Sequence, residues 1–96
     1  MQKHYETRAV SIVTKYYGPT NTKGSRIKAD AGRGRTKWIS YPHDEREPHL
    51  AAAMALCEHM GWQDNMLISG GTETGDQVFV MVHPREFDDL KSAMAD

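Results

Sequence analysis

The sequence predicts a small α+β domain, a two-layer sandwich in which one main helix packs on one face of a sheet. In roughly the first 41 residues, apolar side chains cluster or alternate with the period of two that is typical of strands. After that point they recur at helical spacing, and a run of strong β propensity follows at residues 77–82. The expected order is βββαββ plus a short C-terminal helix. One antiparallel or mixed sheet covered by the main helix buries both apolar faces, within a single domain of residues 1–96.

Three strands are expected before the main helix. Residues 8–17 are rich in β-branched and aromatic side chains and stop at a Gly-Pro pair. Residues 25–31 alternate between an apolar face and a mostly basic face. The turn Gly32-Arg33-Gly34 leads into residues 36–41, so the second and third strands should form a hairpin.

The main helix is expected to end at Gly61. Its start has two interpretations, a capping box from Asp44 to Glu47 or Pro48 in the first turn. The positions expected on its core-facing side share helical spacing. They are Leu50, Ala53, Met54, Cys57 and Met60.

The sequence after residue 61 predicts two strands and a second helix. Residues 62–69 are expected to form a short strand and 70–75 a flexible loop, and residues 77–82 form a strand that should lie centrally in the sheet. Pro84 is suited to open a short acidic helix. The residues that define its apolar side include Phe87, Leu90 and Met94.

Composition places the chain among ordinary globular proteins, with 39% hydrophobic and 26% charged residues. The one cysteine, Cys57, lies inside the apolar helical pattern and is expected to be a buried small hydrophobe in a reducing compartment. No apolar run approaches the roughly 18 to 20 residues that span a bilayer, and residues 1–6 show no signal core. A cytoplasmic location without membrane contact is expected.

The net charge of −1 hides two halves of opposite sign. Residues 1–43 hold nine Lys or Arg against two acidic residues, a net of +7, whereas residues 44–96 have a net of −8. Seven of the cations lie between residues 15 and 37, interleaved with glycines. A cation-rich, glycine-containing stretch favours an anionic ligand, most often a phosphate.

The segment of residues 15–26 combines groups that help to hold such a ligand. Glycines allow close approach of backbone N–H groups, short polar side chains offer hydrogen bonds, cations add charge, and Tyr16 and Tyr17 are suited to stack on a base. It contains no phosphate-loop or dinucleotide fingerprint. The candidate ligand-binding residues, with three further cations, are Lys15, Tyr16, Tyr17, Gly18, Pro19, Thr20, Asn21, Thr22, Lys23, Gly24, Ser25, Arg26, Lys28, Arg33 and Arg35.

Each of these residues also has a structural interpretation. Gly-Pro-Thr-Asn is ordinary loop chemistry, Tyr16 fits a core position, and alternating Arg26 and Lys28 suit the solvated face of an edge strand. This interpretation is weaker for the whole group, because seven cations set against Asp30 alone exceed what solubility requires.

Two runs, residues 14–29 and 49–62, resemble a family of small uncharacterised proteins encoded by phages and other mobile elements. Members carry a KY-x-GPTN-x-x-GSR-I-x-A motif followed by a helix that ends in Gly-Trp. The resemblance covers about half of the chain and implies a role in virus–host conflict or replication, in the host cytoplasm, without implying a particular activity. The positions it singles out are Gly18, Pro19, Thr20, Asn21, Gly24, Ser25 and Arg26.

Other site chemistries are disfavoured. His43, Asp44, Glu45 and His49 match no common zinc spacing. Cys57 and His59 are two residues apart on a helix, so they point in different directions. We therefore expect no metal site, no bound cofactor and no catalytic residue.

Three functions remain open. The first is a non-enzymatic protein that binds a phosphorylated ligand, either a nucleotide or single-stranded nucleic acid. If the protein is encoded by a phage, this function includes sequestering a host signalling nucleotide, and an oligomer with binding sites shared between chains is then expected. The second is a protein that binds and inhibits a host defence protein through its charged faces, as anti-CRISPR proteins do. The third, a small nucleotide hydrolase, lacks a convincing nucleophile or base. The basic loop favours the first.

Overall fold

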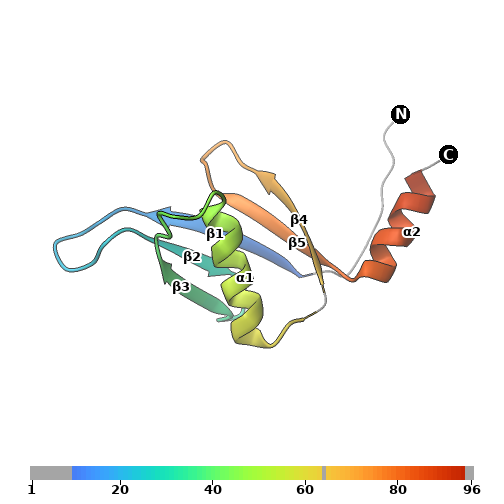
Figure 1. Ribbon diagram of the computed structural model, residues 1–96, viewed down its shortest axis with the longest axis horizontal. Helices are drawn as coiled ribbons and strands as arrows, with labels where there is room; N and C mark the ends of the chain where they lie inside the picture. The colour runs from blue at the N-terminus through green and yellow to red at the C-terminus, as the bar shows by residue number, and fades with distance from the viewer. Residues whose placement is uncertain (1–9, 64, 95–96) are drawn as a thin grey trace.

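The computed structural model describes residues 10–63 and 65–94 and confirms the two-layer α+β architecture (Figure 1). A five-stranded sheet has the order β3-β2-β1-β5-β4, and all its neighbours are antiparallel. Helix α1 lies across one face of this sheet. The strands are β1 (Ser11–Tyr17), β2 (Arg26–Asp30), β3 (Thr36–Ser40), β4 (Met66–Gly71) and β5 (Gln77–Val82).

The predicted hairpin of β2 and β3 is present, and its turn has the expected glycine chemistry. Gly32, Arg33 and Gly34 all have positive φ, at 83°, 54° and 76°. The Asp30 carboxylate accepts the N–H of Gly32 at 2.7 Å, and the N–H of Arg35 donates to the Gly32 carbonyl at 3.0 Å. The first strand begins at Ser11, and residues 8–9 of the predicted strand lie outside the described residues.

The last two strands differ from expectation in detail. The strand predicted over residues 62–69 occupies Met66–Gly71, so Gly70 and Gly71 extend the ladder and the loop shortens to residues 72–76. Strand β5 has the predicted bounds and is an interior strand, while β1 holds the middle of the sheet.

Helix α1 spans Pro48–Met60. The capping-box prediction is wrong, because Glu47 is the N-cap and its side chain makes no capping hydrogen bond; Pro48 opens the helix instead. The predicted end is confirmed. Gly61 adopts φ 74°, and the N–H of Trp62 donates to the Cys57 carbonyl at 2.8 Å, as in a Schellman motif.

The core lies between α1 and the sheet, and the buried strand side chains come from β1, β2 and β5. Its fully buried large side chains include Ile12, Ile27, Leu56 and Phe79. The predicted core face of α1 was partly wrong. Ala52, Ala53 and Leu56 are the buried positions, whereas Met54 is 56% exposed. The helix is apolar on nearly every side, so its spacing alone did not determine which side packs on the sheet.

Helix α2 (Pro84–Met94) follows β5 at the predicted place and extends beyond the end of the sheet (Figure 1). It takes no part in the main packing between elements. The side chains of Phe87, Leu90 and Met94, predicted on its apolar side, lie outside what the structure describes. Neither described helix has the length and apolar character needed to cross a membrane.

The buried face of α1 predicts the outcome of two substitutions on one helix. Leu56→Ala removes a fully buried side chain and should lower the free energy of unfolding by about 2–5 kcal/mol. Met54→Ala removes a mostly exposed one and should change it by about 0.5 kcal/mol or less. Urea unfolding followed by circular dichroism measures both, and equal losses would contradict the observed helix orientation.

Candidate functional site

The sheet face opposite α1 brings basic and aromatic side chains from three strands together. Residues that pair directly across antiparallel strands project to the same face. Lys15 pairs with Lys28, and Lys28 pairs with Trp38 on its other side. Tyr17 pairs with Arg26 in the same way. We call these five side chains the cation–aromatic strip: Lys15, Tyr17, Arg26, Lys28 and Trp38.

The two aromatic rings of the strip are in contact. The ring centroids of Tyr17 and Trp38 are 4.9 Å apart at an interplanar angle of 52°. The Arg26 guanidinium carbon lies 5.6 Å from the Tyr17 centroid and 5.0 Å from that of Trp38. Cation–π contacts of this kind hold a long side chain in place at about 0.5–1 kcal/mol on an exposed surface.

The lysines flank this centre on the same face. The Nζ of Lys15 lies 5.7 Å from the Tyr17 centroid, and that of Lys28 lies 5.5 Å from the Trp38 centroid. Within residues 10–63 and 65–94, no carboxylate forms an ion pair with Lys15, Arg26 or Lys28. Like charges directly opposite one another destabilise a sheet. The Lys15–Lys28 pair therefore places two positive charges opposite one another, and a bound anion would reduce their repulsion.

Two shallow hollows extend the strip in both directions. One, of about 380 Å³, is lined by Lys15, Tyr17 and Lys28 and also by the acidic residues Asp30 and Asp76. The other, of about 340 Å³, is lined by Lys23 and Ser25 together with Arg26 and Trp38. Because the strip separates the two hollows, the surface suits an extended ligand better than a compact one.

Residues 18–25 of the predicted binding segment join β1 to β2 and extend beyond the sheet (Figure 1). The tip of this loop is closed by its own hydrogen bonds. The N–H of Thr20 donates to the Lys23 carbonyl at 2.7 Å, and the N–H of Lys23 donates to Thr20 Oγ1 at 3.0 Å. Gly18 and Gly24 do not adopt positive φ. Pro19, Thr20, Asn21, Thr22 and Lys23 are all exposed.

The two neighbouring tyrosines lie on opposite faces of the sheet. Tyr16 is on the α1 side, where its hydroxyl donates to Ser25 Oγ at 3.1 Å and its ring meets Tyr41 edge-on at 5.5 Å. Tyr17 belongs to the strip. The predicted tyrosine pair is therefore not one stacking platform, and the ring beside Tyr17 is Trp38.

Sequence reasoning missed Trp38 as a site residue. The sequence pattern that could have identified Trp38 is the alternation of β3, which places Trp38 on the opposite face of the strand from the half-buried Ile39. Recognising it required the register with β2, because only the pairing of Trp38 with Lys28 brings it beside Arg26.

The two candidate arginines of the hairpin turn are separate from the strip. Arg35 donates through Nη2 to the Ala31 carbonyl at 2.7 Å and through Nε to the Gly32 carbonyl at 3.1 Å. Its guanidinium also lies 5.4 Å from the Trp62 ring, beyond the end of α1. Arg35 thus closes the turn, and Arg33 is exposed at its tip.

Three other titratable side chains, His49, His43 and Cys57, make contacts within the fold. Nδ1 of His49 lies 2.7 Å from Oγ1 of the buried Thr14, and the His43 ring lies 4.9 Å from Tyr41. In the described part of the chain, no three His, Cys, Asp or Glu side chains gather as a metal-binding group. Half-buried Cys57 lies 3.8 Å from the Met81 sulfur, and its burial raises the pKa of the thiol.

Compared with known proteins, the chain matches no protein-family model, no curated protein and no solved structure at a significant level. The resemblance to a phage family therefore stays a prediction from the motif.

Proposed function

We propose that this protein binds single-stranded nucleic acid, without catalysing a reaction, on the sheet face that carries the cation–aromatic strip. The observation that carries the proposal is the contact of Tyr17 and Trp38 on an open face, with Arg26 within 5.6 Å of both rings. Aromatic rings beside a basic groove are the equipment with which proteins hold unpaired bases.

The arrangement favours single strands over duplexes. Trp38 is 43% exposed, so a base can stack on its ring. In a duplex the faces of the bases are covered by their neighbours, whereas an unpaired base offers its π-face to the protein. Two adjacent rings suit two successive bases of one strand.

Phosphate contacts would come from the cations around the rings. Lys15 and Lys28 lie beside the first hollow, and Lys23 and Arg26 line the second. Arg26 is suited to hold a phosphate through two parallel hydrogen bonds. In this proposal the loop of residues 18–25 extends the positive surface through Lys23, and the strip, not the loop, supplies base stacking.

A narrower version of this proposal is that the ligand is a free nucleotide, since a nucleotide offers the same base and phosphate groups as a short single strand. Sequestration of a host signalling nucleotide and oligomerisation belong to that version. Inhibition of a host defence protein is the alternative function, and the protein is proposed to act in the cytoplasm in each case.

Removing either ring of the strip should weaken binding. Trp38→Ala and Tyr17→Ala should each lower the affinity for a labelled 12-nucleotide oligothymidylate by about 5- to 150-fold, which corresponds to 1–3 kcal/mol per stacked base. Fluorescence anisotropy measures the change, and urea unfolding verifies that each variant is folded.

Tyr16→Ala is the matched control, because Tyr16 is adjacent in sequence but lies on the other face of the sheet. An equal loss with Tyr16→Ala would contradict the proposed site. Displacement of the oligonucleotide by a mononucleotide at similar concentration would identify a nucleotide as the ligand instead.

The strip cations should determine how binding depends on salt. For single strands the slope of log K against log salt is about −0.7 for each phosphate neutralised, so Arg26→Gln should make the slope shallower by about 0.7. Arg46→Gln makes the same charge change at an exposed position before α1 and should leave the slope unchanged. Equal changes in both variants would indicate that only overall charge matters.

A further inference from the structure

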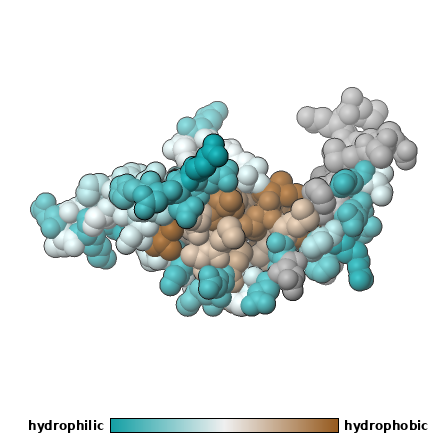
Figure 2. Space-filling model, in the orientation of Figure 1, coloured by the Kyte–Doolittle hydropathy of each residue, from teal (hydrophilic) through white to brown (hydrophobic). Residues whose placement is uncertain are grey.

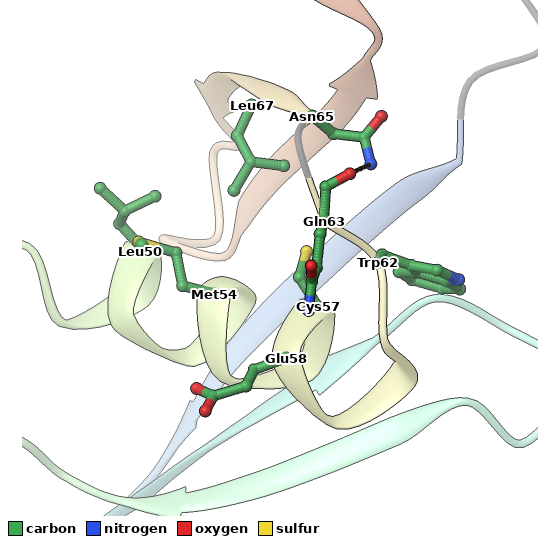
Figure 3. A pocket seen from close by; sticks show the side chains of 8 residues that line it. All are labelled: Leu50, Met54, Cys57, Glu58, Trp62, Gln63, Asn65 and Leu67. Carbon is green, nitrogen blue, oxygen red and sulfur yellow. Dashed lines mark hydrogen bonds between the residues drawn. The ribbon is translucent and has the colours of Figure 1, made fainter.

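An apolar groove on the other side of the molecule separates α1 from β4. Helix α1 packs mainly on β1, β2 and β3, and only marginally on β5. Because β4 is the edge strand beyond β5, the helix leaves the inner face of β4 only partly covered. The groove has a volume of about 500 Å³ and is lined by Leu50, Met54, Cys57, Glu58, Trp62, Gln63, Asn65 and Leu67 (Figure 3).

Its floor and walls are mostly apolar. Leu50 and Met54 are one helical turn apart on α1, and Leu67 faces them from β4 (Figure 3). Figure 2 shows apolar surface gathered over this part of the molecule, between hydrophilic regions. Met54 is 56% exposed and unbranched, so it adapts to a partner surface. A continuous apolar patch of this kind is typical of an interaction site.

The rim of the groove is acidic. Glu58 lines the groove and also borders an adjoining hollow on the outer side of α1, which Leu50 and Met54 share. That hollow adds three carboxylates and a single cation, Arg46. The added acidic residues are Asp44, Glu45 and Glu47. A cationic segment with apolar anchors is complementary to this combination.

The charge of the rim disfavours two other occupants. Helix α2 of this chain or of a second copy carries Asp88 and Asp89 and is itself acidic in sequence. The acidic rim would repel both this helix and nucleic acid, because all of them carry negative charge. We propose that the groove between α1 and β4 binds a cationic amphipathic helix of a partner protein, whose apolar side chains insert between Met54 and Leu67.

A synthetic peptide tests this surface directly. The probe is a labelled 14-residue helix of Lys and Leu with Leu at helical spacing, and the control is its Glu and Leu counterpart. Fluorescence anisotropy should show that the unmodified protein binds the Lys peptide at least tenfold more tightly than the Glu peptide. Equal binding of the two peptides would overturn the proposal.

Variants locate the binding site. Glu58→Lys should weaken binding of the Lys peptide roughly fivefold, whereas Glu73→Lys, the same charge change at an exposed position in the β4–β5 turn, should have little effect. Met54→Ala should weaken it about tenfold through loss of the anchor contact. Equal effects of Glu58→Lys and Glu73→Lys would overturn the proposal, because they would show attraction to overall charge only.

Cys57 provides an independent readout, since it is the only cysteine of the chain and it lines the groove. The bound Lys peptide should slow the reaction of Cys57 with a maleimide, because the peptide would cover the groove that Cys57 lines. An unchanged maleimide rate would overturn the proposal. The proposal would also be overturned if the protein self-associates and Glu58→Lys abolishes that self-association, because a second copy of the chain would then occupy the groove.

Discussion

The structure depends on how one short helix packs on a wider sheet. Helix α1 has 13 residues and the sheet has five strands, so α1 covers only part of one face. Buried alanines at positions 52 and 53 let its backbone approach the sheet, and Leu56 fills the centre of the core with Ile12, Ile27 and Phe79. Placing α1 over β1–β3 leaves the other face of these three strands open and the inner face of β4 only partly covered.

This packing also determines which side chains are available to a ligand. Along a strand, every second residue faces the helix, so burying Ile27 and Ala29 forces Arg26 and Lys28 onto the open face. Register with β1 and β3 then adds Tyr17 and Trp38. A shift of one residue in the register of β2 would turn Arg26 and Lys28 toward the core. The hydrophobic residues on one face of β2 therefore determine which cations lie on the other face.

Local patterns predicted what local chemistry controls. The fold class, the β2–β3 hairpin, the bounds of β5 and the helix end at Gly61 follow from periodicity and from glycine conformation. The strand order depends on long-range pairing that no local pattern contains. Strand alternation already separates Tyr16 from Tyr17, whereas the contact of Tyr17 with Trp38 depends on the β1–β2 and β2–β3 registers. Met54 was misplaced because α1 is apolar on nearly every side.

The charge asymmetry of the sequence becomes a separation in space. The basic first half supplies β1, β2 and β3 with the strip, and the acidic second half supplies α1 with the rim of its groove. Each surface repels the ligand proposed for the other, since nucleic acid is anionic and the proposed helix is cationic. The two surfaces lie on opposite faces of the sheet, so both can be occupied at once. The proposed single strand and the proposed cationic helix would therefore not compete for one surface, and the net charge of −1 hides two surfaces of opposite sign.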